Sequence, residues 1–250
     1  MQNPISIPRT PIESSPRIRE PEDLRHPFLT LYCGHCGRPL RVKLGCGDRT
    51  CPECRRKWFG YHFKALFGLV SRWRAAYFLT LTIKNIPDKA FGCGDVRDLR
   101  KAFEKLRRRF KQIAGGFYVV QATNKGSGWH LHIHAVFDGA FISQRELSDA
   151  WREITTVSFI VDIRKVTDPG TAVRYLLSDF LQAPRIRPED AAIFNGVFKG
   201  SRLVQPFGKY RATKFRTPYK CPDCGSVYWA PLWELLGEKP SFKRLYEDDA

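Results

Sequence analysis

The stretch GFYVVQATNKGSGWHLHIHAVF, residues 116–137, decides how the middle of this 250-residue chain is expected to fold. Two runs rich in β-branched and aromatic residues, 116–123 and 129–137, flank NKGSG, and together they predict a β-hairpin. If the turn is centred between Gly126 and Ser127, Gln121 lies opposite His132 on the same face. A β-bulge would shift this register by one residue and turn Gln121 to the other face.

Three of the six histidines of the chain, His130, His132 and His134, occupy alternate positions of the second run. Side chains alternate along a strand, so the three rings share one face and the apolar residues between them line the core face. Imidazole is a common metal ligand, and the amide oxygen of Gln121 would lie beside the rings. The hairpin therefore predicts a metal site, with a half-exposed, histidine-rich strand as the alternative.

The segments around the hairpin alternate between strands and helices. Two further runs, 77–83 and 158–166, are short, rich in β-formers and predict strands. Apolar residues at steps of three and four predict helices over 95–113, from 143 and from 168. The order strand, helix, strand, strand, helix, strand, helix predicts an α+β fold, a ferredoxin-like or RRM-like split βαβ antiparallel sheet with small zinc-binding modules.

The expected helices begin at residues that can satisfy free backbone N–H groups. Asp95 is placed to cap the first helix. Ser143 and Glu146 have capping-box spacing at the start of the second helix. Asp168 followed by Pro169 begins the third helix, with proline at the first helical position.

The third helix places two chemically useful side chains next to each other. Tyr175 and Asp179 are four residues apart, beside an apolar face that packs on a core. An amphipathic helix with a tyrosine at the edge of its core is the simpler interpretation of this segment by itself. A metal face needs a reacting group, however, and Tyr175 is the candidate.

The composition favours a polyanionic partner. The chain has a formal net charge of +17 and a pI of about 9.8. Lysines and arginines that hold phosphates release counterions, which favours nucleic acid; a ribosomal-type structural role or a basic tail is the alternative. The outer face of the expected 95–113 helix concentrates this charge, either as a solvated surface or as a DNA contact. Its basic residues are Arg97, Arg100, Lys101, Lys105, Arg108, Arg109 and Lys111.

The absence of certain motifs excludes some classes of function. No Gly-rich phosphate loop ending in Gly-Lys-Ser/Thr occurs, so nothing indicates a helicase or ATPase motor. No apolar run approaches the roughly 18 residues of a membrane span, and MQNPISIPRT (1–10) lacks the core of a signal peptide. We therefore expect a cytoplasmic protein with no membrane partner.

Four regions are expected along the chain. Residues 1–28, with six prolines, predict a disordered lead-in, and 29–75 a Cys-rich zinc module. Residues 76–182 form the expected core, and 183–250 a basic C-terminal region with a Cys-x-x-Cys knuckle. Within the last region, FKGSRLVQPFGKYRATKFRTPYK (198–220) offers rings for stacking and cations for phosphates, or else is a solvated basic linker. The candidate DNA contacts are Lys199, Arg202, Lys209 and Arg211, with Arg174 on the third helix.

Paired cysteines predict structural zinc, because a reducing compartment disfavours disulfides. The three pairs are Cys33 with Cys36, Cys51 with Cys54, and Cys221 with Cys224. The first two pairs, 14 residues apart, have the spacing of a zinc ribbon or treble clef and can form one four-cysteine site. Alternatively, the third pair joins the first and leaves Cys46 with the second pair for another ion. Lone Cys93 is expected to be structural or free.

In this order the motifs resemble those of the HUH endonucleases, specifically the rolling-circle replication initiators (Rep) of plasmids and phages. His132-Ile133-His134 is similar to the His-hydrophobe-His strand that names the superfamily, within a Trp-His-x-His-x-His form at 129–134. FLTLT (78–82) resembles the first family motif and AVRYLLSDF (172–180) the third. CGDRTCPEC (46–54) resembles the Cys-rich segment of plasmid Reps. The resemblance covers roughly residues 76–182.

The resemblance implies roles for particular residues. His132, His134 and Gln121 would hold Mg²⁺ or Mn²⁺, with His130 as a candidate extra ligand. Tyr175 would attack origin DNA, leaving a 5′-phosphotyrosine and a free 3′-hydroxyl, and the strands would later be rejoined. The implied partners are single-stranded origin DNA and a host helicase and polymerase, in the cytoplasm of a bacterial or archaeal cell that carries a mobile element.

The chain also departs from the family pattern. Gln121 stands where such Reps often have Glu, and Ser178 and Asp179 replace the Lys and second Tyr of the third motif. Our hypothesis makes Asp179 a general base for a water that resolves the DNA adduct; a solvated helix residue is the alternative. Two other functions remain open: a single-tyrosine transposase or relaxase, and a non-catalytic zinc-finger DNA-binding protein, which Gln121 and Ser178 favour.

Overall fold

The computed structural model describes residues 25–178, 185–215 and 219–237. These residues divide into two compact units, one containing the parts before residue 48 and after residue 215, and the other spanning 48–215. Most of the predicted lead-in, 1–24, lies outside the described residues. Residues 25–28, which were included in that lead-in, are described: His26 is buried and a strand begins at Phe28.

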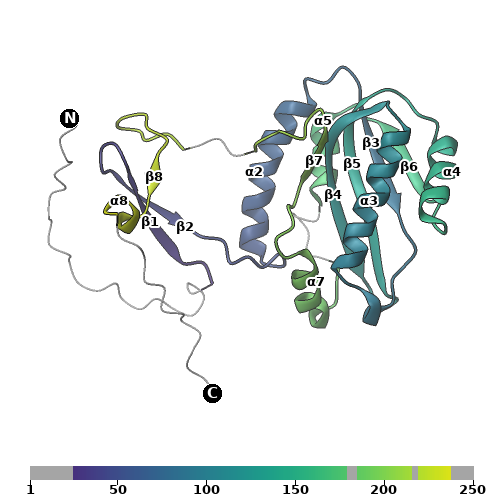
Figure 1. The fold of residues 1–250 in the computed structure, drawn as a ribbon, viewed down its shortest axis with the longest axis horizontal. Helices are drawn as coiled ribbons and strands as arrows, with labels where there is room; N and C mark the ends of the chain where they lie inside the picture. Colours follow the sequence, from purple (N-terminus) through teal and green to yellow (C-terminus); the bar gives the residue numbers. More distant parts are fainter. Residues whose placement is uncertain (1–24, 179–184, 216–218, 238–250) are drawn as a thin grey trace. The chain divides into compact units, whose positions relative to one another are not determined.

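The larger unit is built on a five-stranded antiparallel sheet with strand order β6-β3-β5-β4-β7 (Figure 1). The first four strands have the order of the predicted split βαβ sheet, so the α+β fold class is confirmed. β7 extends this sheet beyond the expected core, because it comes from the C-terminal region and pairs with β4. The strands are β3 (Ala76–Thr82), β4 (Ile113–Asn124), β5 (Trp129–Gly139), β6 (Val161–Lys165) and β7 (Gln205–Gly208).

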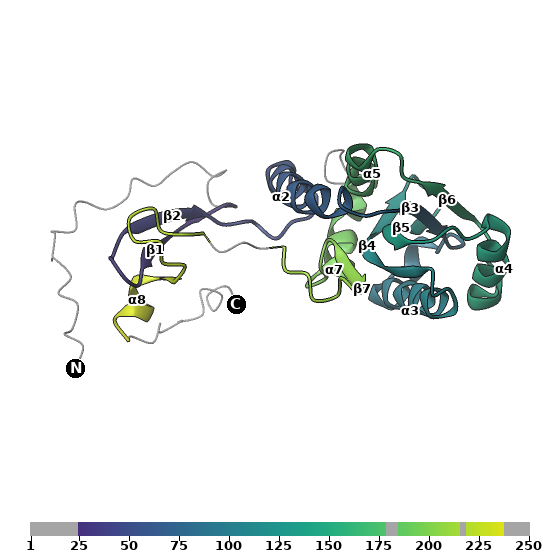
Figure 2. The same ribbon diagram turned by 90° about the horizontal axis from the view of Figure 1, so that it is seen from above.

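Helices cover both faces of this sheet, and each face has its own apolar core. α3 (Cys93–Arg109), α4 (Gln144–Thr155) and α7 (Ala191–Phe198) pack on one face. α2 (Pro52–Val70) and α5 (Pro169–Leu176) pack on the other. Figure 2 shows α3 and α5 on opposite sides of the strands. Two short 3₁₀ helices, Asp88–Ala90 and Pro188–Asp190, complete the unit.

The helix caps were largely predicted. Ser143 and Glu146 form the expected capping box, and Asp168 accepts hydrogen bonds from the N–H groups of Gly170 and Thr171 at 2.9 and 3.0 Å. The prediction that Asp95 caps the helix was wrong, because α3 begins two residues before it, at Cys93. As the third helical residue, Asp95 accepts a hydrogen bond from the Gly92 N–H at 2.8 Å. The helix also ends at Arg109, four residues short of the expected end.

The hairpin of β4 and β5 has the predicted register, with Gln121 opposite His132. The one irregularity in this pair lies at the far end, between Ile113 and Gly115, and leaves the histidine region undisturbed. At the turn, Gly126 and Gly128 have φ values of +99° and +89°, which residues with a Cβ rarely adopt. The glycines therefore help to fix which residues of the two strands face each other.

The smaller unit has a three-stranded sheet of order β2-β1-β8. Its elements are β1 (Phe28–Cys33), β2 (Pro39–Lys43), β8 (Trp229–Ala230) and α8 (Leu232–Leu235). β8 pairs antiparallel with the end of β1, so the C-terminal segment folds against the N-terminal hairpin (Figure 1). In the residues that the structure describes, no helix is long and apolar enough to cross a membrane.

Candidate metal and nucleophile site

Neighbouring strands of the larger sheet gather polar side chains around the histidines of β5. His132 Nε2 lies 2.7 Å from Gln121 Oε1 on β4, and His134 Nδ1 lies 3.0 Å from Thr80 Oγ1 on β3. The rings of His132 and His134 are 4.7 Å apart between centroids. Gln121, His132 and His134 are therefore brought together on one face, as the sequence predicted.

The two histidines sit in an environment that keeps them uncharged. Burial, together with the neighbouring His134 and His130 rings, lowers the pKa of His132 to about 3. Burial lowers the pKa of His134 to about 4, with an opposing effect of Asp162. Both imidazoles are neutral near pH 7, which is the form that binds a metal ion.

Two buried atoms of this group have no hydrogen-bond partner among the described residues: Gln121 Nε2 and His132 Nδ1. An unsatisfied buried polar group costs about 1–3 kcal/mol, so native proteins rarely keep one without a reason. Two neutral imidazoles and an amide oxygen form a nitrogen and oxygen donor set that suits a divalent ion of the Mg²⁺ or Mn²⁺ class. The residues present fit such an ion.

His130 lies at the edge of this group. Its ring is 5.3 Å from that of His132 between centroids, and its Nδ1 lies 2.8 Å from Asn85 Oδ1. Asn85 therefore holds the ring at the hairpin end of the row. The position of His130 is compatible with an extra ligand but separate from the His132 and Gln121 contact.

Tyr175 packs directly against the histidine face. Its ring lies 5.1 Å from that of His134 and 5.1 Å from that of Phe78, nearly edge-on to both. α5 is anchored by buried Val173 and Leu176, which leaves Tyr175 at the rim of the core with 54% of its surface exposed. A tyrosine accessible to a large substrate thus stands next to a candidate metal ligand. Asp179, the other predicted catalytic residue, lies outside the described residues.

A pocket of about 420 Å³ opens beside Tyr175, between β6 and α5. Its wall includes Asp162 and Arg164 of β6 and Thr171 of α5. Asp162 on β6 pairs with Thr80 on β3, and Thr80 pairs with His134 on β5. Asp162 therefore lies two strands from His134, in the same row of residues across the sheet. Asp162 was not among the site residues predicted from the sequence, although it alternates with Val161 and Ile163 in the predicted strand 158–166.

The cysteines form two groups, each with ligand atoms within 4.8 Å of one another. The first contains Cys33, Cys36, Cys221 and Cys224, with Sγ–Sγ distances of 3.5 Å for Cys33–Cys224 and 3.6 Å for Cys36–Cys221. The Cys36 backbone N–H, first among several hydrogen bonds, lowers the pKa of Cys33 to about 6, and the thiolate is the form that binds metal. The single site combining the first two cysteine pairs is therefore not formed.

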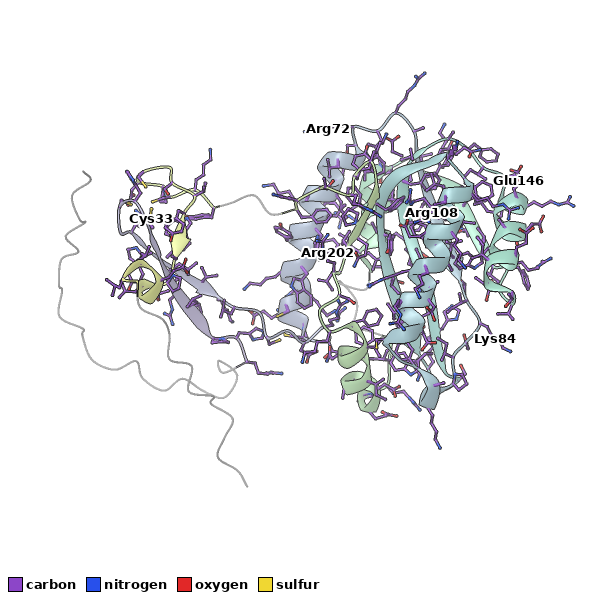
Figure 3. All side chains as sticks on the ribbon, viewed as in Figure 1. Cys33, Arg72, Lys84, Arg108, Glu146 and Arg202 are labelled. Atoms are coloured by element: carbon purple, nitrogen blue, oxygen red, sulfur yellow. The ribbon has the colours of Figure 1, made fainter. Side chains whose placement is uncertain are left out.

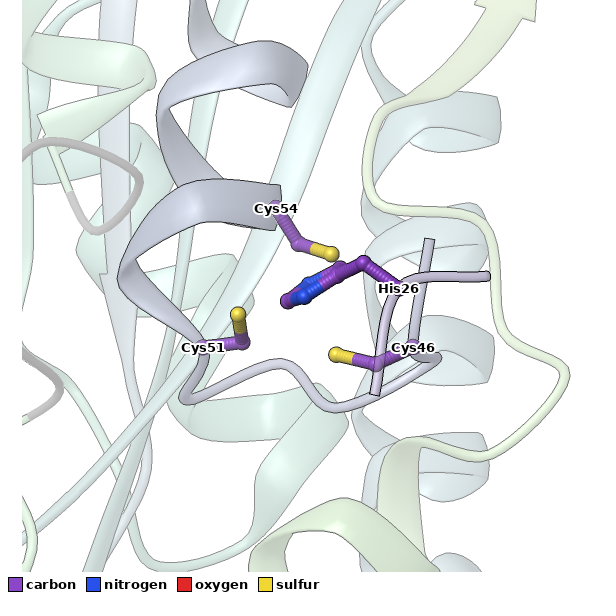
Figure 4. A group of neighbouring side chains, drawn as sticks. All are labelled: His26, Cys46, Cys51 and Cys54. Carbon is purple, nitrogen blue, oxygen red and sulfur yellow. The ribbon is translucent and has the colours of Figure 1, made fainter. Parts of the chain in front are cut away.

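The second group contains a histidine that was not predicted as a ligand. His26 joins Cys46, Cys51 and Cys54, and the four side chains point toward one another (Figure 4). His26 was overlooked because it lies in the proline-rich segment predicted to be disordered. Closed sets of four cysteine and histidine ligands are typical of structural zinc, so both groups can hold a zinc ion. Cys93 belongs to neither group.

The predicted DNA contacts remain on the surface, but two of the rings among them, Phe198 and Phe207, do not. Lys199, Arg202, Lys209 and Arg211 are exposed, and Arg174 stacks 5.0 Å from the Phe63 ring centroid. Phe198 and Phe207 are buried, and the Tyr210 hydroxyl donates to Asp138 at 3.0 Å. Phe198 and Phe207 are therefore not available to stack on bases, whereas Tyr219 is exposed, and the segment to residue 215 is part of the sheet unit and not a linker.

Over 166 residues the chain is 27% identical to a protein named "Protein rep" of Streptococcus pneumoniae serotype 2 (strain D39 / NCTC 7466). The alignment covers 57% of this chain and 51% of that protein, so the chain spans about half the length of the curated relative it matches. No family model and no solved structure matches the chain.

Proposed function

We propose that this chain is a replication initiator that nicks single-stranded origin DNA with Tyr175 as the nucleophile. The observation that carries the proposal is the contact of the Tyr175 ring with His134, on the face that also holds His132 and Gln121. The similarity to a protein named "Protein rep" supports a role in replication and DNA as the partner. An accessible tyrosine can supply the nucleophile for phosphodiester cleavage, and neutral imidazoles can hold an assisting metal ion.

His132, His134 and Gln121 would hold Mg²⁺ or Mn²⁺, with His130 as a further candidate. When bound, such an ion polarises a nonbridging phosphate oxygen and offsets the charge that develops on the phosphate. Thr80 orients His134 through its Nδ1, which leaves the other ring nitrogen for the ion. Gln121 brings an oxygen without a negative charge, so the protein part of the site is neutral.

Tyr175 would form a bond between its Oη and the phosphorus while the bond from phosphorus to the 3′ oxygen breaks. The phenolic proton is lost and the leaving oxygen gains one, so the products are a 5′-phosphotyrosine and a free 3′-hydroxyl. The adduct keeps the energy of the phosphodiester, which allows strands to be rejoined by the reverse attack. The free 3′-hydroxyl is a primer for a host polymerase, and a chain without an ATPase motif depends on a host helicase.

Asp179 is our candidate general base for the step that releases the DNA adduct and ends a round of replication. It follows Tyr175 by four residues in the sequence, and a carboxylate close to the adduct can activate a water for attack on it. If Asp179→Asn left both nicking and adduct release unchanged, this part of the proposal would fail.

The experiment that tests the proposal is strand cleavage of a single-stranded origin oligonucleotide with Mn²⁺. Tyr175→Phe should bind the oligonucleotide but form no adduct, because it lacks the attacking oxygen. Tyr210→Phe is the matched control: burial and the hydrogen bond to Asp138 raise the pKa of Tyr210 to about 12, which makes it a poor nucleophile. Adduct formation by Tyr175→Phe would refute the proposal.

A further inference from the structure

A stripe of long side chains runs along the outer face of α3. Its members recur at steps of three and four, so they are neighbours on the helix surface, and they line a shallow groove of about 450 Å³. These residues, here called the α3 stripe, are Arg97, Arg100, Lys101, Glu104, Lys105 and Arg108. Figure 3 shows Arg108 on this helix.

The positive charge of the α3 stripe is only partly neutralised. Glu104 pairs with Arg107, outside the stripe, at 2.7 Å, and Lys101 pairs with Asp98 at 3.3 Å. Arg97, Lys105 and Arg108 have no acidic partner in the part of the chain that the structure describes. A row of five cations with one already-paired carboxylate attracts a polyanion.

Two neighbouring arginines, Arg100 of the α3 stripe and Arg49, also favour a bound anion. Arg100 Nε is buried with no hydrogen-bond partner among the described residues. Arg49, which donates to the Ser201 carbonyl and lies over the Phe198 ring, is close enough for its pKa to be lowered to about 10 by burial and by the charge of Arg100. Two guanidinium groups that repel each other are stabilised when an anion binds beside them.

The α3 stripe and Tyr175 lie on opposite faces of one sheet. α3 packs on the core that contains Phe103 and Leu106, whereas α5 packs on the core that contains Val136 and Phe78 (Figure 2). The few nucleotides held at Tyr175 therefore cannot also touch the α3 stripe. A partner of this surface needs to be a separate stretch of polyanion.

The side chains also indicate what kind of polyanion fits. Proteins that hold single strands combine cations with exposed aromatic rings on which bases stack. α3 exposes no ring, because its one aromatic residue, Phe103, is fully buried. A helix of 17 residues, about 25 Å long, that presents only charge matches the regular phosphate row of a duplex.

We infer that the α3 stripe binds the sugar-phosphate backbone of duplex DNA. This surface adds a duplex partner to the proposed nicking function, on the face of the sheet opposite the candidate nicking site. The contact is electrostatic and independent of base sequence, because lysine and arginine contacts to phosphates carry no information about the bases. It does not require the nicking reaction, so the two proposals can fail separately.

The test compares full-length variants for binding to a 30-base-pair mixed-sequence DNA duplex between 50 and 200 mM salt. Arg97→Gln/Lys105→Gln/Arg108→Gln keeps residues with good helix propensity while it removes the three charges without an acidic partner. For three lost phosphate contacts, the slope of log affinity against log salt should become shallower by about 2.7. The triple variant should still cleave a single-stranded oligonucleotide at the wild-type rate.

The matched control is Lys89→Gln/Arg145→Gln/Arg152→Gln, which removes three exposed cations elsewhere on the same unit. Its salt slope should stay near that of the wild type. An unchanged slope in the α3 variant, or an equal loss in the control, would overturn the inference. A wild-type chain that binds the duplex through α3 but forms no adduct would overturn the nicking proposal alone.

Discussion

Gln121 brings an uncharged oxygen to a pair of buried, uncharged imidazoles, and this neutral donor set would determine how tightly the candidate site binds an ion. Gln121 and His134 are 4% and 5% exposed, so any charge placed there is removed from water. A carboxylate at this position would be costly without a cation and favourable with one. We therefore expect the neutral site to be less destabilising when empty than a site with a carboxylate, and to bind a divalent ion less tightly.

Gln121→Glu should therefore change stability in opposite directions with and without metal. In EDTA the variant should have a lower Tm than the wild type, because a buried carboxylate beside neutral His132 has no cation to offset its charge. With Mn²⁺ it should bind the ion about tenfold more tightly, equivalent to about 1.4 kcal/mol, because the ligand set gains a charge. Calorimetric titration and thermal unfolding measure both effects; Mn²⁺ affinity equal to that of the wild type would contradict the ligand role of Gln121.

At the level of single elements, α5 matters because it carries Tyr175 and is only eight residues long. Its N-terminus is held by Asp168, whose carboxylate accepts from the backbone and hydroxyl of Thr171 and from Gly170 N–H. These hydrogen bonds, the Thr171 hydroxyl first, lower the pKa of Asp168. Because the pKa of Asp168 is lower in the folded state, the cap stabilises the helix at pH values above the ordinary pKa of aspartate. This stabilisation is lost as the pH falls through the lowered pKa of the folded state.

Asp168→Ala should slow adduct formation by Tyr175 several-fold at pH 7.5, because the helix start is no longer held. Asp168→Asn keeps an oxygen that can cap and should stay close to the wild-type rate. Single-turnover cleavage of a single-stranded oligonucleotide checks both variants. If alanine and asparagine were equally active, the cap would have no part in positioning Tyr175.

The elements that local chemistry specifies were predicted, and those that distant contacts create were not. The turn glycines and the alternation of residues 129–137 were enough to place Gln121 opposite His132. β7 is four residues long and contains Pro206, so its strand character comes from pairing with β4. The contact of Tyr175 with His134 also depends on how α5 packs on the sheet, which only the resemblance to HUH endonucleases anticipated.

For the whole molecule, zinc is expected to stabilise a chain whose smaller unit has short strands. Its three-stranded sheet includes β8, which has two residues, and few of its side chains are buried. Cys221 and Cys224 lie 185 or more residues from the cysteines they contact, so a bound ion would tie distant parts of the chain together. The spacing of the cysteines could not show which pairs share an ion. The first pair could combine with either the second pair or the third pair.

Non-denaturing mass spectrometry should find two zinc ions per chain, one for each group. Cys221→Ser/Cys224→Ser and His26→Ala/Cys46→Ala should each reduce the number to one, because they remove ligands from different groups. Only one ion in the wild type, or loss of both ions in either double variant, would contradict two independent sites.

The central claim is that Tyr175 becomes covalently joined to DNA in a reaction that needs a divalent ion. The most direct measurement is to react the wild-type chain with a single-stranded origin oligonucleotide and Mn²⁺, digest protein and DNA, and locate the nucleotide mass by tandem mass spectrometry. Trypsin cuts after Arg174 and Arg185, so the linked residue should lie in the peptide of residues 175–185. The modification should be on Tyr175 and absent in EDTA. A nucleotide on a peptide containing Tyr210 or Tyr219, or none with Mn²⁺ present, would contradict the claim.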